Sequence, residues 1–184
     1  MNHATSASNA PTLETERLLL RPLVKADLDD LHRISNEPLV HRYLWDEEPV
    51  SKDMIEKVIV QSARMFSEEG LGLFGICLRS SEELVGFCGF ARWEGMEEVE
   101  LTYELLPELW GRGLVTEAAR ACLRYAIEEV RLPRVIAGAD ASNVASLRVI
   151  EKLGMKPTGN LNPHAPDVPY YVLYRKNFSA PGAG

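Results

Sequence analysis

A Gly-Arg-Gly turn, Gly111 to Gly113, separates an apolar run typical of a strand from a segment with the periodicity of a helix. Glycine frees the backbone for conformations that other residues avoid, and it removes side chains that would keep a ligand away from the amides. The start of a helix carries unsatisfied amides and about half a positive charge. The turn therefore predicts an anion site, with Arg112 adding a cation at its rim. A tight turn without a ligand is the simpler alternative.

The segments around this turn indicate a mixed α/β sheet, mostly antiparallel and with one late crossover between neighbouring strands. Apolar runs bounded by turn residues predict strands, and apolar residues three or four positions apart predict helices. Ser51 and Thr116 are expected to cap helices, and Gly70 to end one. The expected elements are a strand at 17–23, helices from 27 and 51, strands at 72–79, 84–93 and 99–106, a helix from 116, a strand at 134–140, a helix at 143–154 and a strand from 169.

Length and composition favour one domain without nucleic-acid or membrane partners. Of 184 residues, 46% are hydrophobic, which suits one core, so we expect a domain at 13–178 between flexible tails at 1–12 and 179–184. A net charge of -7 argues against binding to nucleic acid or anionic lipid. No apolar stretch approaches the ~20 residues of a membrane span. Three cysteines in apolar runs predict buried thiols, no metal site and a cytoplasmic location: Cys77, Cys88 and Cys122.

A dinucleotide-binding fold is the first competing interpretation of the turn. Residues 111–116 miss the G-x-G-x-x-G/A fingerprint only at its last position, and Asp140 ends the next expected strand, where a ribose-binding acid would lie. In that fingerprint, however, the glycines follow the strand directly, whereas residues 107–110 intervene here. The chain also offers only one crossover unit. Dinucleotide binding is therefore the less favoured alternative.

Two segments together resemble the GNAT superfamily of N-acetyltransferases: "LLPELWGRGLVTEAARACLRYA" at 105–126 and "NVASLRVIEKLGM" at 143–155. The similarity extends from 13–23 to 170–176, and within the superfamily it is to the RimJ/RimL-like type. It implies helices on both faces of the sheet and acetyl-CoA as cofactor. It also implies a bulged strand at 104–106, where the sheet splays to take the pantetheine arm.

The resemblance also assigns residues to the cofactor. Amides of the turn and of the following helix would hold the pyrophosphate, the Leu105 amide would polarise the thioester carbonyl as an oxyanion-hole donor, and Asn143 would contact pantetheine. In the family pattern (Q/R)-x-x-G-x-(G/A), this chain has Trp110 and Val115 at the first and last positions. The expected cofactor-binding residues are Leu105, Trp110, Gly111, Arg112, Gly113, Leu114, Val115, Thr116 and Asn143.

Acetyl transfer to an amine needs a base and a proton source for the leaving thiolate. Many superfamily members use a tyrosine where this chain has Ile150, so the acid role falls by elimination on Ser146. Glu98, Glu100 and Glu104 share one face of a predicted strand, a pattern most often found on a solvated face. Glu100 matches a glutamate common in the subfamily and is the first choice for the base.

The acceptor is expected to be a primary amine, either a protein N-terminus or a small molecule. The aromatic residues that could wall its pocket are Tyr43, Trp45, His164, Tyr170 and Tyr171, although such residues are more often part of a core. We expect direct attack of the amine in a ternary complex, by a monomer or a homodimer. A catalytically weak acyl-CoA-binding sensor is the alternative from a different functional class.

Overall fold

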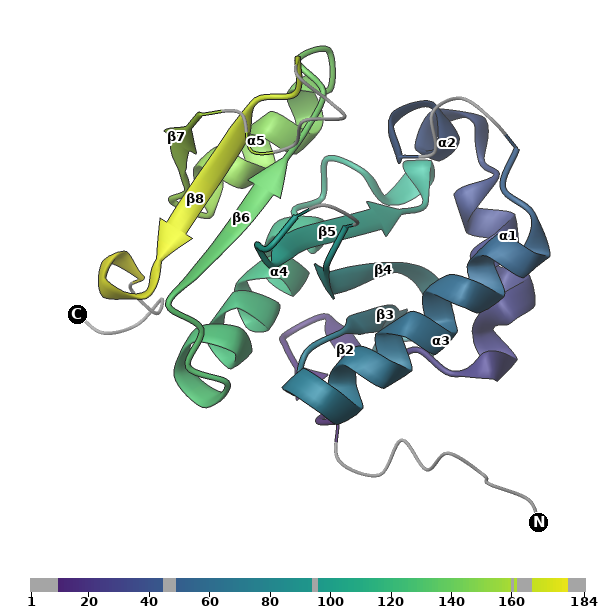
Figure 1. The fold of residues 1–184 in the computed structure, drawn as a ribbon. Helices are drawn as coiled ribbons and strands as arrows, with labels where there is room; N and C mark the ends of the chain where they lie inside the picture. Colours follow the sequence, from purple (N-terminus) through teal and green to yellow (C-terminus); the bar gives the residue numbers. More distant parts are fainter. Residues whose placement is uncertain (1–9, 45–48, 94–95, 160, 162–166, 179–184) are drawn as a thin grey trace.

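The computed structural model describes residues 10–44, 49–93, 96–159, 161 and 167–178. Its strands are β1 (Leu13–Glu14), β2 (Leu18–Pro22), β3 (Leu73–Leu78), β4 (Leu84–Ala91), β5 (Glu100–Leu105), β6 (Arg134–Gly138), β7 (Lys156–Thr158) and β8 (Tyr170–Tyr174). Among the described residues they form one sheet in the order β1-β2-β3-β4-β5-β6-β8-β7. Only β5 and β6 pair in parallel. The mixed, mostly antiparallel sheet expected from the sequence is thus confirmed (Figure 1).

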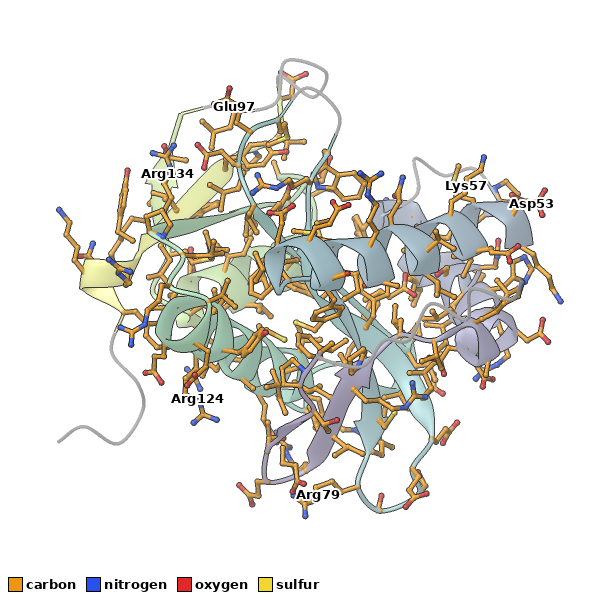
Figure 2. All side chains as sticks on the ribbon, turned by 60° about the horizontal axis from the view of Figure 1, so that its bottom comes forward. Asp53, Lys57, Arg79, Glu97, Arg124 and Arg134 are labelled. Atoms are coloured by element: carbon orange, nitrogen blue, oxygen red, sulfur yellow. The ribbon has the colours of Figure 1, made fainter. Side chains whose placement is uncertain are left out.

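Helices cover both faces of this sheet. They are α1 (Leu28–Ser35), α2 (Pro38–Leu44), α3 (Lys52–Glu69), α4 (Leu114–Arg124) and α5 (Val144–Lys152). In Figure 1, α3 crosses in front of the sheet with α1 beside it at the right, whereas α4 and α5 lie behind the sheet. In Figure 2, charged side chains such as Asp53, Lys57 and Arg79 lie at the periphery, and the space between helices and sheet is filled with carbon. None of the described helices has the length and hydropathy to cross a membrane.

The ends of α3 confirm the expected capping. Ser51 Oγ accepts a hydrogen bond from Met54 N at 3.2 Å, and Gly70 ends the helix with a φ of 72°. Three elements were not predicted, namely β1, which has only two residues, and also α2 and β7. Helix α2 is seven residues long and begins at a proline, and β7 has three residues including Pro157, so neither presents a usable apolar period.

The start of α4 differs from the prediction. Thr116 was expected to cap this helix, but the cap position is Gly113, and the helix begins two residues earlier, at Leu114. Gly113 has a φ of 78°, in the left-handed region that glycine adopts without a steric cost. This backbone turn replaces a side-chain cap, and Thr116 is buried within the first helical turn.

An opening lies between β5 and β6. The two strands are joined by a single residue pair, Glu100 with Ile136, whereas β5 remains paired with β4 as far as Leu105. The sheet therefore splays, as the resemblance implied. The register between β4 and β5 is regular along its whole length, from Ala91 with Glu100 to Gly86 with Leu105. The splay thus arises because β6 diverges, and no bulge appears in that ladder at 104–106.

Candidate active site

The glycine turn forms an uncrowded group of backbone amides. Gly111 and Gly113 have φ angles of 74° and 78°, and a Cβ added to Gly111 would meet no atom within 4 Å. The first helical bond of α4 runs from Glu117 N to Gly113 O at 3.0 Å. The amides of residues 114–116 consequently have no acceptor within the helix. The turn therefore has the geometry of the anion site that the sequence predicted.

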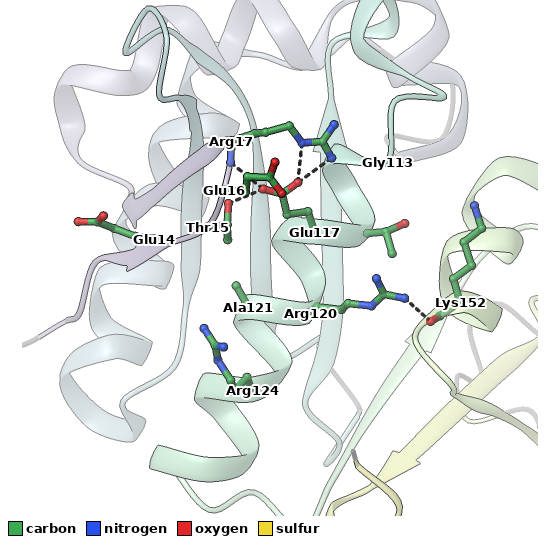
Figure 3. A pocket seen from close by; sticks show the side chains of 11 residues that line it. Glu14, Thr15, Glu16, Arg17, Gly113, Glu117, Arg120, Ala121, Arg124 and Lys152 are labelled. Carbon is green, nitrogen blue, oxygen red and sulfur yellow. Dashed lines mark hydrogen bonds and ion pairs between the residues drawn. The ribbon is translucent and has the colours of Figure 1, made fainter. Parts of the chain in front are cut away.

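A group of three residues, here called the N-terminal clasp, ties the start of the chain to this turn: Thr15, Arg17 and Glu117 (Figure 3). The Arg17 guanidinium pairs with Glu117 at 2.6 Å, and its Nη1 donates to Arg112 O at 2.9 Å. Thr15 Oγ1 donates to Glu117 Oε1 at 2.6 Å. Burial alone would raise the pKa of Glu117, but the bonds from Thr15 and Arg17 outweigh it, and the pKa is lowered.

We predict that Glu117→Gln lowers the free energy of unfolding at pH 7 by about 1 kcal/mol, because the charged pair is lost while Arg17 is half exposed. When folding lowers the pKa of a carboxyl group, its ionised form stabilises the folded protein at pH values above the unfolded pKa. This stabilisation is lost as the pH falls through the folded pKa. The difference in the free energy of unfolding between wild type and variant should therefore become smaller below about pH 4.5. Urea unfolding at several pH values measures it, and a difference independent of pH would contradict the prediction.

A pocket of about 530 Å³ runs along α4 from the clasp towards α5. Figure 3 shows the clasp on one side of it and Lys152 on the other. Arg120 Nη2 donates to Lys152 O at 3.1 Å and so bridges α4 and α5. The cationic side chains that line the pocket are Arg17, Arg120, Arg124 and Lys152. The sequence did not reveal this pocket, since its walls come from segments about 100 positions apart.

The end of β5 presents free amides to the opening. Leu106 N donates to Val85 O of β4 at 2.9 Å. Amides alternate in direction along an antiparallel strand, so those of Tyr103 and Leu105 face the other side, where β6 has diverged. Trp110 Nε1 donates to Leu105 O at 2.7 Å and fixes this end of the strand. The Leu105 amide thus has the orientation that an oxyanion-hole donor requires.

Ser146 lies opposite β5, at the start of α5. Its amide donates to Asn143 Oδ1 at 3.1 Å, so Asn143 caps this helix. The Ser146 hydroxyl oxygen is 2.7 Å from the phenol oxygen of Tyr103. Ile150 is fully buried and offers no proton. Tyr103 was missed as a site residue, because an aromatic residue in an alternating strand pattern signals only a core face.

Glu100 is buried at the closed end of the opening, with 7% of its surface exposed. Its Oε1 accepts from Gly138 N at 3.0 Å, and its Oε2 is buried without a hydrogen-bond partner among the described residues. Burial raises the pKa of Glu100 to about 7, although the Gly138 amide and the nearby Trp93 act in the opposite direction. A carboxyl group with this pKa is suited to accept a proton near neutral pH.

The expectation of a solvated face is wrong for two of the three glutamates. Glu104 is only 4% exposed, and its Oε1 accepts from Ser35 Oγ at 2.8 Å. Ser35 belongs to α1, which packs over this end of the meander and covers Glu104, whereas Glu100 is buried beside Gly138 of β6. Glu98 precedes β5 and pairs with Arg134 at the surface.

The aromatic residues proposed for the acceptor pocket are only partly brought together. Tyr170 is 4% exposed and packs over Gly138, where an added Cβ would lie 2.8 Å from its ring. It is therefore close to the amide that binds Glu100. Tyr171 is half-buried against the main core, and Tyr43 lies half-buried in α2, which packs on β5. Trp45 and His164 lie outside the described residues.

Comparison with known proteins decides the family. Residues 17–156 match the family model described as "Acetyltransferase (GNAT) domain". This chain belongs to the GNAT acetyltransferases. It is 30% identical to the uncharacterized N-acetyltransferase YoaA of Bacillus subtilis, over 82% of this chain and 86% of that one. It is 26% identical to the putative ribosomal N-acetyltransferase YdaF of the same organism, over 89% and 94%. The crystal structure of an Agrobacterium tumefaciens acetyltransferase superposes with a TM-score of 0.80 and 27% identity, covering 89% and 94%.

The GNAT chain is therefore an N-acetyltransferase that uses acetyl-CoA and acetylates an amine. Membership of this family decides against the dinucleotide alternative. The RimJ/RimL-like resemblance is confirmed by the match to YdaF. In the described part of the chain, no group of three or more His, Cys, Asp or Glu side chains is arranged to hold a metal ion. The three cysteines are buried and free.

Proposed function

We propose that the pyrophosphate of acetyl-CoA binds to the amides of residues 111–116, and that its pantetheine arm lies in the opening between β5 and β6. The observation that carries this proposal is the uncrowded turn, whose amides and helix start suit an anion. The pocket along α4 begins at the same turn, and the basic side chains in its lining, Arg120, Arg124 and Lys152, suit the remaining phosphate of the cofactor, although Glu14, Glu16 and Glu117 also line it. Asn143 stands at the other wall of the opening, at the start of α5.

We propose direct attack of the amine on the thioester, which the bound cofactor supplies as an activated acetyl group. The Leu105 amide faces the opening and would donate to the carbonyl oxygen as negative charge develops there. The Ser146 hydroxyl would donate a hydrogen bond to the departing sulfur. Each group acts most strongly in the transition state, which is the condition for lowering the barrier.

We propose Glu100 as the general base. It lies on the face of the sheet opposite to Ser146, so an amine and a thiol could approach the opening from different sides. Its pKa of about 7 keeps a fraction ionised at neutral pH. Glu100 precedes Tyr103 by three residues, a distance of about 10 Å along a strand, so the proton would pass through water. Its unpartnered Oε2 is the atom that would accept it.

The acceptor is a protein N-terminus or a small amine in this proposal, and the fold does not choose between them. Tyr43, Trp45, His164, Tyr170 and Tyr171 remain proposed contacts. The buried free thiols support work in a reducing cytoplasm. The oligomeric state remains the prediction of a monomer or a homodimer.

Thermal melting with CoA, acetyl-CoA or NAD tests the cofactor site. A ligand at 100 times its Kd stabilises by about 2.7 kcal/mol, which for a domain of this size raises the Tm by about 5–10 °C. CoA and acetyl-CoA should both do so, and NAD should not. A panel of amines, including N-terminal peptides, polyamines and amino acids, is then screened for release of the CoA thiol. Tight acetyl-CoA binding without thiol release from any amine would favour the sensor.

A further inference from the structure

We propose that Tyr103 is a positioning residue that fixes the Ser146 hydroxyl for hydrogen bonding to the leaving sulfur. This inference rests on the role of Ser146 proposed above. The phenol of Tyr103 comes from β5 and the hydroxyl of Ser146 from α5, so their contact joins the two walls of the opening. The two oxygens are 2.7 Å apart, a normal distance for a hydrogen bond between hydroxyl groups.

The direction of this bond follows from the available acceptors. Tyr103 has one hydroxyl hydrogen, and the second oxygen within its reach is the Ser146 carbonyl, at 3.3 Å. In a helix this carbonyl already accepts a hydrogen bond from the amide four residues later. Its distance of 3.3 Å from the phenol oxygen is also longer than the 2.7 Å between the phenol oxygen and Ser146 Oγ. We therefore infer that the phenol donates to Ser146 Oγ, the nearer of the two acceptors. Burial raises the pKa of Tyr103, so the donor stays protonated at neutral pH.

This arrangement leaves the Ser146 hydrogen free. Within the described part of the chain, Tyr103 is the residue whose side chain bonds to Ser146 Oγ. With its oxygen accepting from Tyr103, the serine has a hydrogen to offer to another acceptor, and a thiolate in the opening is one. The Asn143 cap holds the Ser146 amide at the same time. Two bonds thus fix the residue that faces the sulfur.

The chemical step balances without ionising either hydroxyl. The amine nitrogen forms a bond to the carbonyl carbon, the carbon–sulfur bond breaks, and its electron pair leaves on sulfur. The proton lost by the amine goes to the base, and the thiolate gains a proton from water after release. Tyr103 and Ser146 only donate hydrogen bonds, which strengthen as charge develops on sulfur.

The test is a double-mutant cycle with Tyr103→Phe and Ser146→Ala. We expect Tyr103→Phe to lower kcat by about five- to tenfold and to leave CoA affinity unchanged, since one hydrogen bond that matters in the transition state is lost. Ser146→Ala should lower kcat by about ten- to 100-fold. In the Ser146→Ala background, Tyr103→Phe should change kcat by less than about twofold, because the group it positions is gone.

Tyr125→Phe is the matched control, because the Tyr125 hydroxyl donates to Gly70 O at the same distance of 2.7 Å, away from the opening. It should leave kcat and KM as in the wild type. 3-Fluorotyrosine at position 103 keeps the donor and should restore kcat. The inference is overturned if Tyr103→Phe lowers kcat equally in both backgrounds, if it weakens CoA binding as much as it lowers kcat, or if Tyr125→Phe has the same effect. Full turnover in Ser146→Ala would refute the proposed role of Ser146, and a loss in Tyr103→Phe alone would then show that Tyr103 acts by another route.

Discussion

Gly113→Asp is expected to weaken CoA binding by at least ~100-fold, because a carboxylate would be placed among amides that hold phosphate. The residue starts α4 in the left-handed conformation, which aspartate tolerates better than most residues. An added Cβ would lie 3.7 Å from Arg17 Nη2, so the new carboxylate would also compete for a cation beside the turn. Isothermal titration calorimetry with CoA measures the loss.

Gly113→Asn is the control for this substitution. Asparagine has nearly the same size and also adopts the left-handed conformation, so both variants share the steric cost and the backbone cost. We expect Asn to weaken CoA binding by about tenfold and Asp by about tenfold more, and the second step reports the charge. Equal affinities of the two variants would show that no phosphate lies close to Gly113.

Glu100→Gln is expected to lower kcat/KM by about 100-fold or more with the best acceptor amine, since general-base help is typically worth ~10²- to 10⁴-fold. The amide keeps an oxygen for the Gly138 N–H but has no capacity to accept a proton. Wild-type activity should rise with pH through about 7, the pKa of Glu100, and this limb should disappear in the variant. A full pH–rate profile measures both effects.

Although Glu100→Gln should lower activity, it should raise the free energy of unfolding relative to the wild type at high pH. The pKa of Glu100 is raised from its ordinary 4.5 to about 7, so the neutral form is favoured by folding. Its stabilising contribution is complete below the unfolded pKa and is lost as pH rises through the folded pKa. Between pH 4.5 and pH 8 the wild type should therefore lose up to about 3 kcal/mol relative to Glu100→Gln.

Glu98→Gln is the matched control, because Glu98 lies two residues away and pairs with Arg134 at the surface. It should preserve both the pH–rate limb and the pH dependence of stability. If Glu100→Gln kept wild-type activity while gaining stability at pH 8, Glu100 would be a buried carboxyl group without a role as base. Glu104, on the same face and bound to Ser35, would then be the next candidate.

The sequence by itself determined the order of the longer elements and the cofactor chemistry. Local signals were sufficient for α3, because its start at Ser51 and its end at Gly70 are both marked by capping residues next to a periodic apolar pattern. The turn from Gly111 to Gly113 predicted an anion site because conformational freedom, missing side chains and a following helix are all encoded within a few residues. The two GNAT motifs then supplied the family, which no single pattern would have done.

The tertiary structure decided the properties that depend on residues far apart in the chain. Alternation along β5 placed Glu100 on one face, but only the tertiary packing buried its side chain and so raised the pKa of Glu100. The clasp from Arg17 to Glu117 spans 100 positions, and the contact of Tyr103 with Ser146 spans 43. Contacts between such distant residues give no signal in the sequence, because each residue fits the pattern of its own strand or helix. The clasp forms only when the start of the chain packs against α4, and the contact of Tyr103 with Ser146 forms only when α5 packs against β5.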